Sequence, residues 1–231
     1  MLLLRSSALL LAAAAVAGSC AALGAGAPAD ARGERAPGAR VCLAALDRLG
    51  VIYRRTDRPG IEIAVEVRGG LGGVEYRSFT GEPLVLDCSL VYSLARTGEI
   101  LRAHGIERVT YSSAYQRRNI RGTSRPSRHS FGLAMDIHSF TLAGGETTAA
   151  VRSDYEQGLG DAADCVGEPL SELGALLRAL ECELTGSGLF RILLTPDHDP
   201  DHYNHFHLEA LPWRERPSPV DPAPPAPQAM R

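Results

Sequence analysis

The sequence predicts an α+β fold in which helices flank a central antiparallel sheet. Helical and strand-like segments follow one another in mixed order, without the regular strand–helix–strand alternation of a parallel sheet. The chain has 231 residues, of which 45% are hydrophobic, so it can bury one core of ordinary size. We therefore expect one domain, over residues 41–214.

The expected elements follow from the spacing of apolar residues and from the turn residues between them. The longest helix has Asp87 as a plausible N-cap and Gly105 just past its end. We expect helices over residues 41–50, 87–105 and 170–184, and strands over residues 61–69, 73–79, 106–113, 131–140, 189–195 and 204–211.

The first 20 residues are expected to be a signal peptide, because Arg5 is followed by an apolar run that is too short for a membrane span. The run ends in "AGSC", which resembles a bacterial lipoprotein cleavage box, although Ala17 stands where leucine is usual. Two outcomes stay open: lipidation of Cys20, which would anchor the protein to a membrane, or plain secretion after a cut nearby. Both predict export to the periplasm or cell envelope.

Both ends of the mature chain are expected to lack regular structure. Residues 21–40 form a tether rich in Gly, Ala and Pro, and residues 215–231 form a Pro-rich tail. The net charge of -3 argues against a nucleic-acid partner. The basic residues are all arginine, which indicates a compositional bias more than a basic binding surface. We expect a monomer.

Four cysteines remain after Cys20, and an even number in an exported chain predicts two disulfides with three possible connectivities. We favour Cys42–Cys88 and Cys165–Cys182. The second pair requires residues 166–170 to run back in extended form along the following helix. The alternative, a zinc site of four thiolates, lacks any CxxC pair.

A carboxylate, Asp136, lies in the middle of an apolar strand, where it needs a cationic partner or a metal. His129 lies seven residues earlier, and His202, His205 and His207 lie within six residues of one another. Residues i and i+2 of a strand share a face, so His205 and His207 point the same way. Together, His129, Asp136 and His207 would provide a catalytic zinc site with one open position.

Simpler interpretations exist for each of these residues. Asp136 could form an ion pair with an arginine. We assign structural roles to His104, His138 and His198. Glu209 shares the parity of the site histidines and is an acid/base candidate, but we favour a charged strand end.

Two motifs resemble those of known families. The stretch "SRHSFGLAMD" (127–136) fits the Ser-x-His-x-x-Gly-x-Ala-x-Asp signature of the zinc D-Ala-D-Ala carboxypeptidases and related murein endopeptidases. The stretch "HYNHFH" (202–207) is similar to an element of the penicillin-insensitive murein endopeptidases. The longer stretch "LLTPDHDPDHYNHFHLE" and the cysteine layout resemble the bacterial extensin-like C-terminal domain family.

This resemblance implies a zinc D,D-peptidase-like fold that cleaves peptides of peptidoglycan stems. It implies Zn²⁺ bound by His129, Asp136 and His207, with His205 activating the zinc water or steadying the oxyanion. It also implies three supporting roles. His202 would orient an imidazole, and Ser127 would order the 127–129 loop. Gly132 and Ala134 would let the strand pass close to the metal.

One position departs from the family pattern. Related sequences often carry an arginine after the strand that precedes the zinc motif, but Gln116 stands there. Arg117 or Arg118 could replace it. Three functions therefore stay open: a zinc peptidase, a zinc-stabilised envelope-binding module without turnover, and a structural protein whose histidines only pack.

Overall fold

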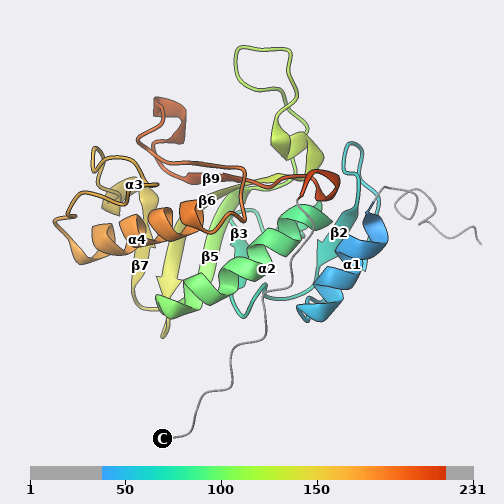
Figure 1. Ribbon diagram of the computed structural model, residues 1–231, viewed down its shortest axis with the longest axis horizontal. Coiled ribbons are helices and arrows are strands. Elements are labelled where there is room, and N and C mark those ends of the chain that lie inside the picture. The colour runs from blue at the N-terminus through green and yellow to red at the C-terminus, as the bar shows by residue number, and fades with distance from the viewer. Residues whose placement is uncertain (1–37, 217–231) are drawn as a thin grey trace, which may run out of the picture.

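The structure, a computed structural model, describes residues 38–216. The predictions for the signal peptide, for Cys20 and for most of the tether and tail lie outside the described residues. The described part is a mixed α+β fold with two sheets (Figure 1). The larger sheet has the strand order β3-β5-β6-β9-β8, with β7 paired to β6, and the smaller has the order β1-β2-β4.

The bounds of the elements are as follows. The small sheet consists of β1 (Tyr53–Arg55), β2 (Ala64–Val67) and β4 (Val85–Asp87). The large sheet consists of β3 (Glu75–Ser78), β5 (Ile106–Ser113), β6 (Ala134–Leu142), β7 (Thr148–Ala150), β8 (Ile192–Leu194) and β9 (Phe206–Glu209). The helices are α1 (Ala39–Arg48), α2 (Cys88–Ala103), α3 (Val151–Asp154) and α4 (Glu172–Gly186), with 3₁₀ turns η2 (Arg128–Phe131), η3 (Pro200–His202) and η4 (Trp213–Glu215).

The prediction of an α+β fold is confirmed, and the larger sheet is mostly antiparallel as expected, but the sheet structure differs from the prediction in two respects. A second, three-stranded sheet is present, and β3 runs parallel to β5 within the mostly antiparallel larger sheet. The parallel pairing arises because the chain between β3 and β5 passes through α2, and parallel neighbours need such a long connection.

Asp87 caps α2 as predicted. Its Oδ1 accepts a hydrogen bond from the Ser89 N–H at 2.8 Å, and its Oδ2 accepts one from the Ile63 N–H at 2.9 Å. The side chain is buried, and burial raises its pKa. Gly105 follows the helix in the left-handed region, with φ of 72°.

The strand expected over residues 131–140 begins only at Ala134, because the preceding residues form η2 and a turn at Gly132. Gly132 has φ of 63°, and its carbonyl accepts a hydrogen bond from the Asp87 N–H at 3.0 Å. A Cβ at Gly132 would lie 2.8 Å from the Asp87 nitrogen. The glycine therefore permits close contact with the start of α2.

The large sheet has one face against the helices and one face turned away from them. Met135 and Ile137 of β6, with Phe206 and Leu208 of β9, belong to the core that the helices cover. In Figure 1, α1, α2 and α4 lie across the same side of the sheets. Since side chains alternate along a strand, Asp136 and its neighbours of equal parity project from the opposite face.

Two disulfides are present, and their pairing is the one favoured from the sequence. Cys42–Cys88 joins α1 to the first residue of α2, and Cys165–Cys182 joins the preceding loop to α4. Two disulfides indicate an extracellular or otherwise oxidising compartment. Between residues 38 and 216, the structure contains no helix that is long and apolar enough to cross a membrane.

Candidate metal centre

His129 is held in a fixed orientation in the 3₁₀ turn before β6. It lies in η2, whose N-cap Ser127 accepts a hydrogen bond from the His129 N–H through its Oγ at 3.4 Å. The imidazole is completely buried, and its Nδ1 lies 3.0 Å from the carbonyl oxygen of Ala114. A carbonyl can only accept, so Nδ1 carries a hydrogen, and Nε2 is the nitrogen that faces the cluster.

Asp136 and His207 approach the His129 Nε2 from adjacent strands. They are direct cross-strand partners in the β6–β9 register. The Asp136 Oδ1 lies 2.7 Å from the His207 Nδ1 and 3.2 Å from the His129 Nε2. The His129 Nε2 and the His207 Nδ1 are 3.3 Å apart. The structure thus brings together the three ligands predicted from the sequence, all of them buried.

The outer nitrogen of His207 is held by Glu209. The His207 Nε2 donates to the Glu209 Oε1 at 3.1 Å, and the other carboxylate oxygen of Glu209 lies 3.7 Å from the Nε of Arg128. A carboxylate on the outer nitrogen of a ligating histidine is a common arrangement in metal sites. Glu209 is the last residue of β9, as favoured from the sequence, and it also contacts the cluster on the side that its shared parity with His207 indicates.

The charges of the cluster are strongly coupled. Burial would raise the pKa of Asp136, but hydrogen bonds with His129 and His207 outweigh it, and the pKa lies well below its usual range. Burial would lower the pKa of His207, but hydrogen bonds to Asp136 and Glu209 raise it to about 9. In the metal-free protein, Asp136 is therefore a carboxylate and His207 an imidazolium. The imidazolium supplies the positive charge that a bound metal would otherwise supply.

The geometry of the cluster fits a metal ion. Zinc–nitrogen distances of about 2.0–2.1 Å place the ligand atoms of a tetrahedral site about 3.3 Å from one another. The two separations that involve His129, 3.2 and 3.3 Å, match this value. The shorter separation, between Asp136 and His207, is a hydrogen bond that a metal would replace. The group could therefore bind a metal ion.

His205 and His202 lie on the open side of this cluster. The Nδ1 of His205 lies 2.9 Å from the Asn204 Oδ1, and its Nε2 lies 3.5 Å from the Asp136 Oδ1. Burial lowers the pKa of His205 to about 4, so the ring is neutral at pH 7. The Nδ1 of His202 is held by Asp199 at 2.7 Å. His202, His205 and His207 also form a second set whose ligand atoms lie within 4.8 Å of one another.

His138, for which a structural role was expected, lies next to His205. Its ring lies 5.4 Å from that of His205, and its Nε2 lies 2.7 Å from the Ser112 Oγ. Burial lowers its pKa. His138 is two residues from Asp136 in β6, so strand parity predicted this position. The other two histidines that were assigned structural roles lie outside the cluster. His104 pairs with Glu183 of α4, and His198 is largely exposed.

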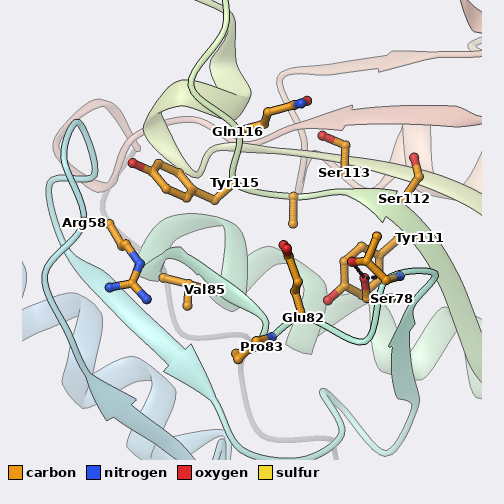
Figure 2. Close-up of a pocket in the computed structure, with 12 residues that line it drawn as sticks. Arg58, Ser78, Glu82, Pro83, Val85, Tyr111, Ser112, Ser113, Tyr115 and Gln116 are labelled. Carbon is orange, nitrogen blue, oxygen red and sulfur yellow. Dashed lines mark hydrogen bonds between the residues drawn. The ribbon is translucent and has the colours of Figure 1, made fainter.

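A cation does lie beside the cluster, although Gln116 occupies the position where arginine was expected. The Arg118 Nη2 is 3.6 Å from the Asp136 Oδ2, and this ion pair is longer than both contacts of Asp136 with histidine. The Gln116 N–H donates to the His129 carbonyl, and its side chain lines a neighbouring cavity (Figure 2). Arg117 and Arg118 both line a separate hollow with Pro59, but among residues 38–216 Arg117 forms no ion pair with Asp136. Of the two replacement candidates, Arg118 is thus the one that reaches the cluster.

Comparison with known proteins adds one match. The model of a family described as the extensin-like protein C-terminus matches residues 42–216. No curated protein and no solved structure matches the chain. The likeness to the zinc D,D-peptidase fold therefore stays a prediction.

Proposed function

The chain belongs to the extensin-like protein C-terminus family, and on that premise we propose that it is an exported zinc-dependent peptidase that hydrolyses amide bonds in peptidoglycan stem peptides. The observation that carries the proposal is the buried group of His129, Asp136 and His207, with the neutral His205 beside it. A purely structural cluster would not need three ligand atoms that converge on one point.

Zinc bound by these three residues would supply a Lewis acid that polarises the substrate carbonyl and makes water a nucleophile near neutral pH. Glu209 would hold the His207 ring through its outer nitrogen, so that the inner nitrogen faces the ion. The Ala114 carbonyl does the same for His129.

The proton transfers are assigned to His205. Its Nδ1 is engaged by Asn204, so Nε2 is the atom that accepts a proton from the attacking water and later donates one to the leaving amine. His202, held by Asp199, packs against it with ring centroids 5.1 Å apart and limits its rotation. Arg118 would bind the carbonyl or carboxylate of the substrate with its planar guanidinium.

A second candidate function, a zinc-stabilised module that binds the cell wall without turnover, is favoured by one observation. Gln116 lines the cavity beside the cluster with an uncharged side chain. If Arg118 does not replace the expected arginine, the charge that develops during the reaction is less stabilised.

Turnover on isolated murein separates the two functions. Zinc-loaded protein is incubated with murein, and the muropeptides are compared by mass spectrometry with those left by the His129→Ala variant. The peptidase predicts new stem-peptide products with the wild type only. Identical muropeptides with both proteins, from a wild type that retains zinc and binds murein, would contradict the peptidase and support the binding module.

We also propose that the domain works in the cell envelope, tethered by residues 21–40 if Cys20 is acylated. Two disulfides support an exported location. A chain of about 20 residues with the flexibility that the Gly-, Ala- and Pro-rich composition predicts would span on the order of 25 Å, which would keep the domain near its membrane. Cys20→Ser should then move the protein from the membrane fraction to the soluble fraction, and unchanged fractionation would argue for plain secretion.

A further inference from the structure

A cavity of about 510 Å³ lies beside the candidate metal centre (Figure 2). Its walls come from three parts of the chain: Arg58 in the β1–β2 connection, residues 78–85 between β3 and β4, and residues 111–116 at the end of β5. Its volume falls in the range of pockets that bind small molecules, roughly 300–1,000 Å³.

The cavity continues the row of residues that forms the cluster. Ser113, which lines the cavity, pairs with Asp136 across β5 and β6, and Asp136 pairs with His207 across β6 and β9. Directly paired residues project from the same face of a sheet. The Ser113 Oγ also lies 3.2 Å from the His129 Nδ1. The cavity and the cluster are therefore neighbours that share Ser113 as a common contact.

The cavity presents one fixed charge of each sign. Glu82 belongs to none of the ion pairs of residues 38–216, and Arg58 donates only to the Asp57 carbonyl, at 3.1 Å. In Figure 2 the Glu82 carboxylate points toward residues 113–116, and Arg58 lies to one side beneath Tyr115. The Tyr115 hydroxyl donates to the Pro59 carbonyl at 2.8 Å, which fixes the loop that carries Arg58.

We infer that this cavity is a subsite for a zwitterionic amino-acid group, one that carries both an ammonium and a carboxylate. Glu82 would accept hydrogen bonds from the ammonium, and Arg58 would bind the carboxylate. The hydroxyls of Ser78 and Ser112 and the Gln116 amide provide neutral hydrogen bonds around them. The identity of the ligand as part of a peptide stem rests on the proposed function.

The subsite is tested by binding, without turnover. Diaminopimelate is titrated into zinc-loaded and zinc-free protein, and chemical shifts are followed by NMR. Two analogues with the same carbon chain serve as probes: pimelate, which lacks the ammonium groups, and 1,5-diaminopentane, which lacks the carboxylates. Glu82→Gln should weaken diaminopimelate and diaminopentane about fivefold or more, the effect of one partly exposed charge contact, and leave pimelate unchanged. Arg58→Gln should weaken diaminopimelate and pimelate and leave diaminopentane unchanged.

Matched variants outside the cavity, Glu146→Gln and Arg48→Gln, should bind all three compounds as the wild type does. Equal affinities of the wild type, Glu82→Gln and Arg58→Gln for diaminopimelate would overturn the assignment, as would shifts confined to other parts of the protein. The outcome is separable from the proposed function. Murein cleavage with an unchanged KM in both cavity variants would contradict the subsite but not the peptidase. Charge-selective binding without cleavage would contradict the peptidase but not the subsite.

Discussion

In the metal-free protein, His207 should titrate near pH 9. The cause is structural: burial opposes the charged imidazole, but hydrogen bonds to Asp136 and Glu209 outweigh burial and raise the pKa from the ordinary 6.5 to about 9. A difference of about 2.5 pH units corresponds to about 3 kcal/mol in favour of the protonated folded state. That stabilisation is fully present below pH 6.5 and is lost as the pH rises through 9. Zinc must displace the same proton, so its affinity should rise as the pH rises toward 9.

The assay is an NMR titration of the imidazole signals after removal of metal with a chelator, together with urea unfolding at pH 6 and pH 9. Glu209→Gln removes the negative charge that stabilises the His207 imidazolium, so the His207 midpoint should move to lower pH. The matched control is Glu183→Gln, which removes the carboxylate that pairs with His104 in an exposed position. A His207 midpoint near 6.5 in the wild type, or equal shifts in both variants, would refute the reasoning.

Three further predictions test the site and its frame. His205→Ala should retain zinc yet lose about 10²–10⁴ in the rate of murein cleavage, the usual cost of a missing acid/base group; loss of zinc in this variant would make it a ligand instead. Gly132→Ala should lower the free energy of unfolding by at least about 2 kcal/mol, because of its positive φ and its contact with backbone, whereas Gly122→Ala, with φ of 73° and open space, should cost about 1 kcal/mol. Removing Cys165–Cys182 by double serine substitution should cost about 3 kcal/mol for a loop of 17 residues, and thiol titration of the unreduced wild type should find no free thiol after signal processing.

Much of the candidate site could be predicted from the sequence because its order is local. Strand parity predicted that His205 and His207 share a face, and the short spacing of His202, His205 and His207 predicted that all three lie together. Parity also places His138 on the face of Asp136, and Glu209 on the face of His207. Their contacts with site residues were not predicted, because a histidine or glutamate in a strand usually only packs or faces solvent.

Other features depend on contacts that no short window of sequence contains. The strands β1 and β4 have three residues each, too few for an apolar period to be visible. The parallel pairing of β3 with β5 depends on how α2, which lies between them in the sequence, packs in the fold. The cavity combines Arg58, Glu82 and Ser112, which are far apart in the sequence. A site formed by these residues could therefore not be predicted before the fold was known.

The central claim, a metal held by His129, Asp136 and His207, is tested most directly by a crystal structure of the zinc-loaded protein with anomalous data at the zinc edge. We expect one anomalous peak bonded to the His129 Nε2, the Asp136 oxygen and the His207 Nδ1, at about 2.0–2.2 Å from each atom. A peak on His202, His205 and His207 without His129, or no peak at the cluster in protein crystallised with zinc, would contradict the claim.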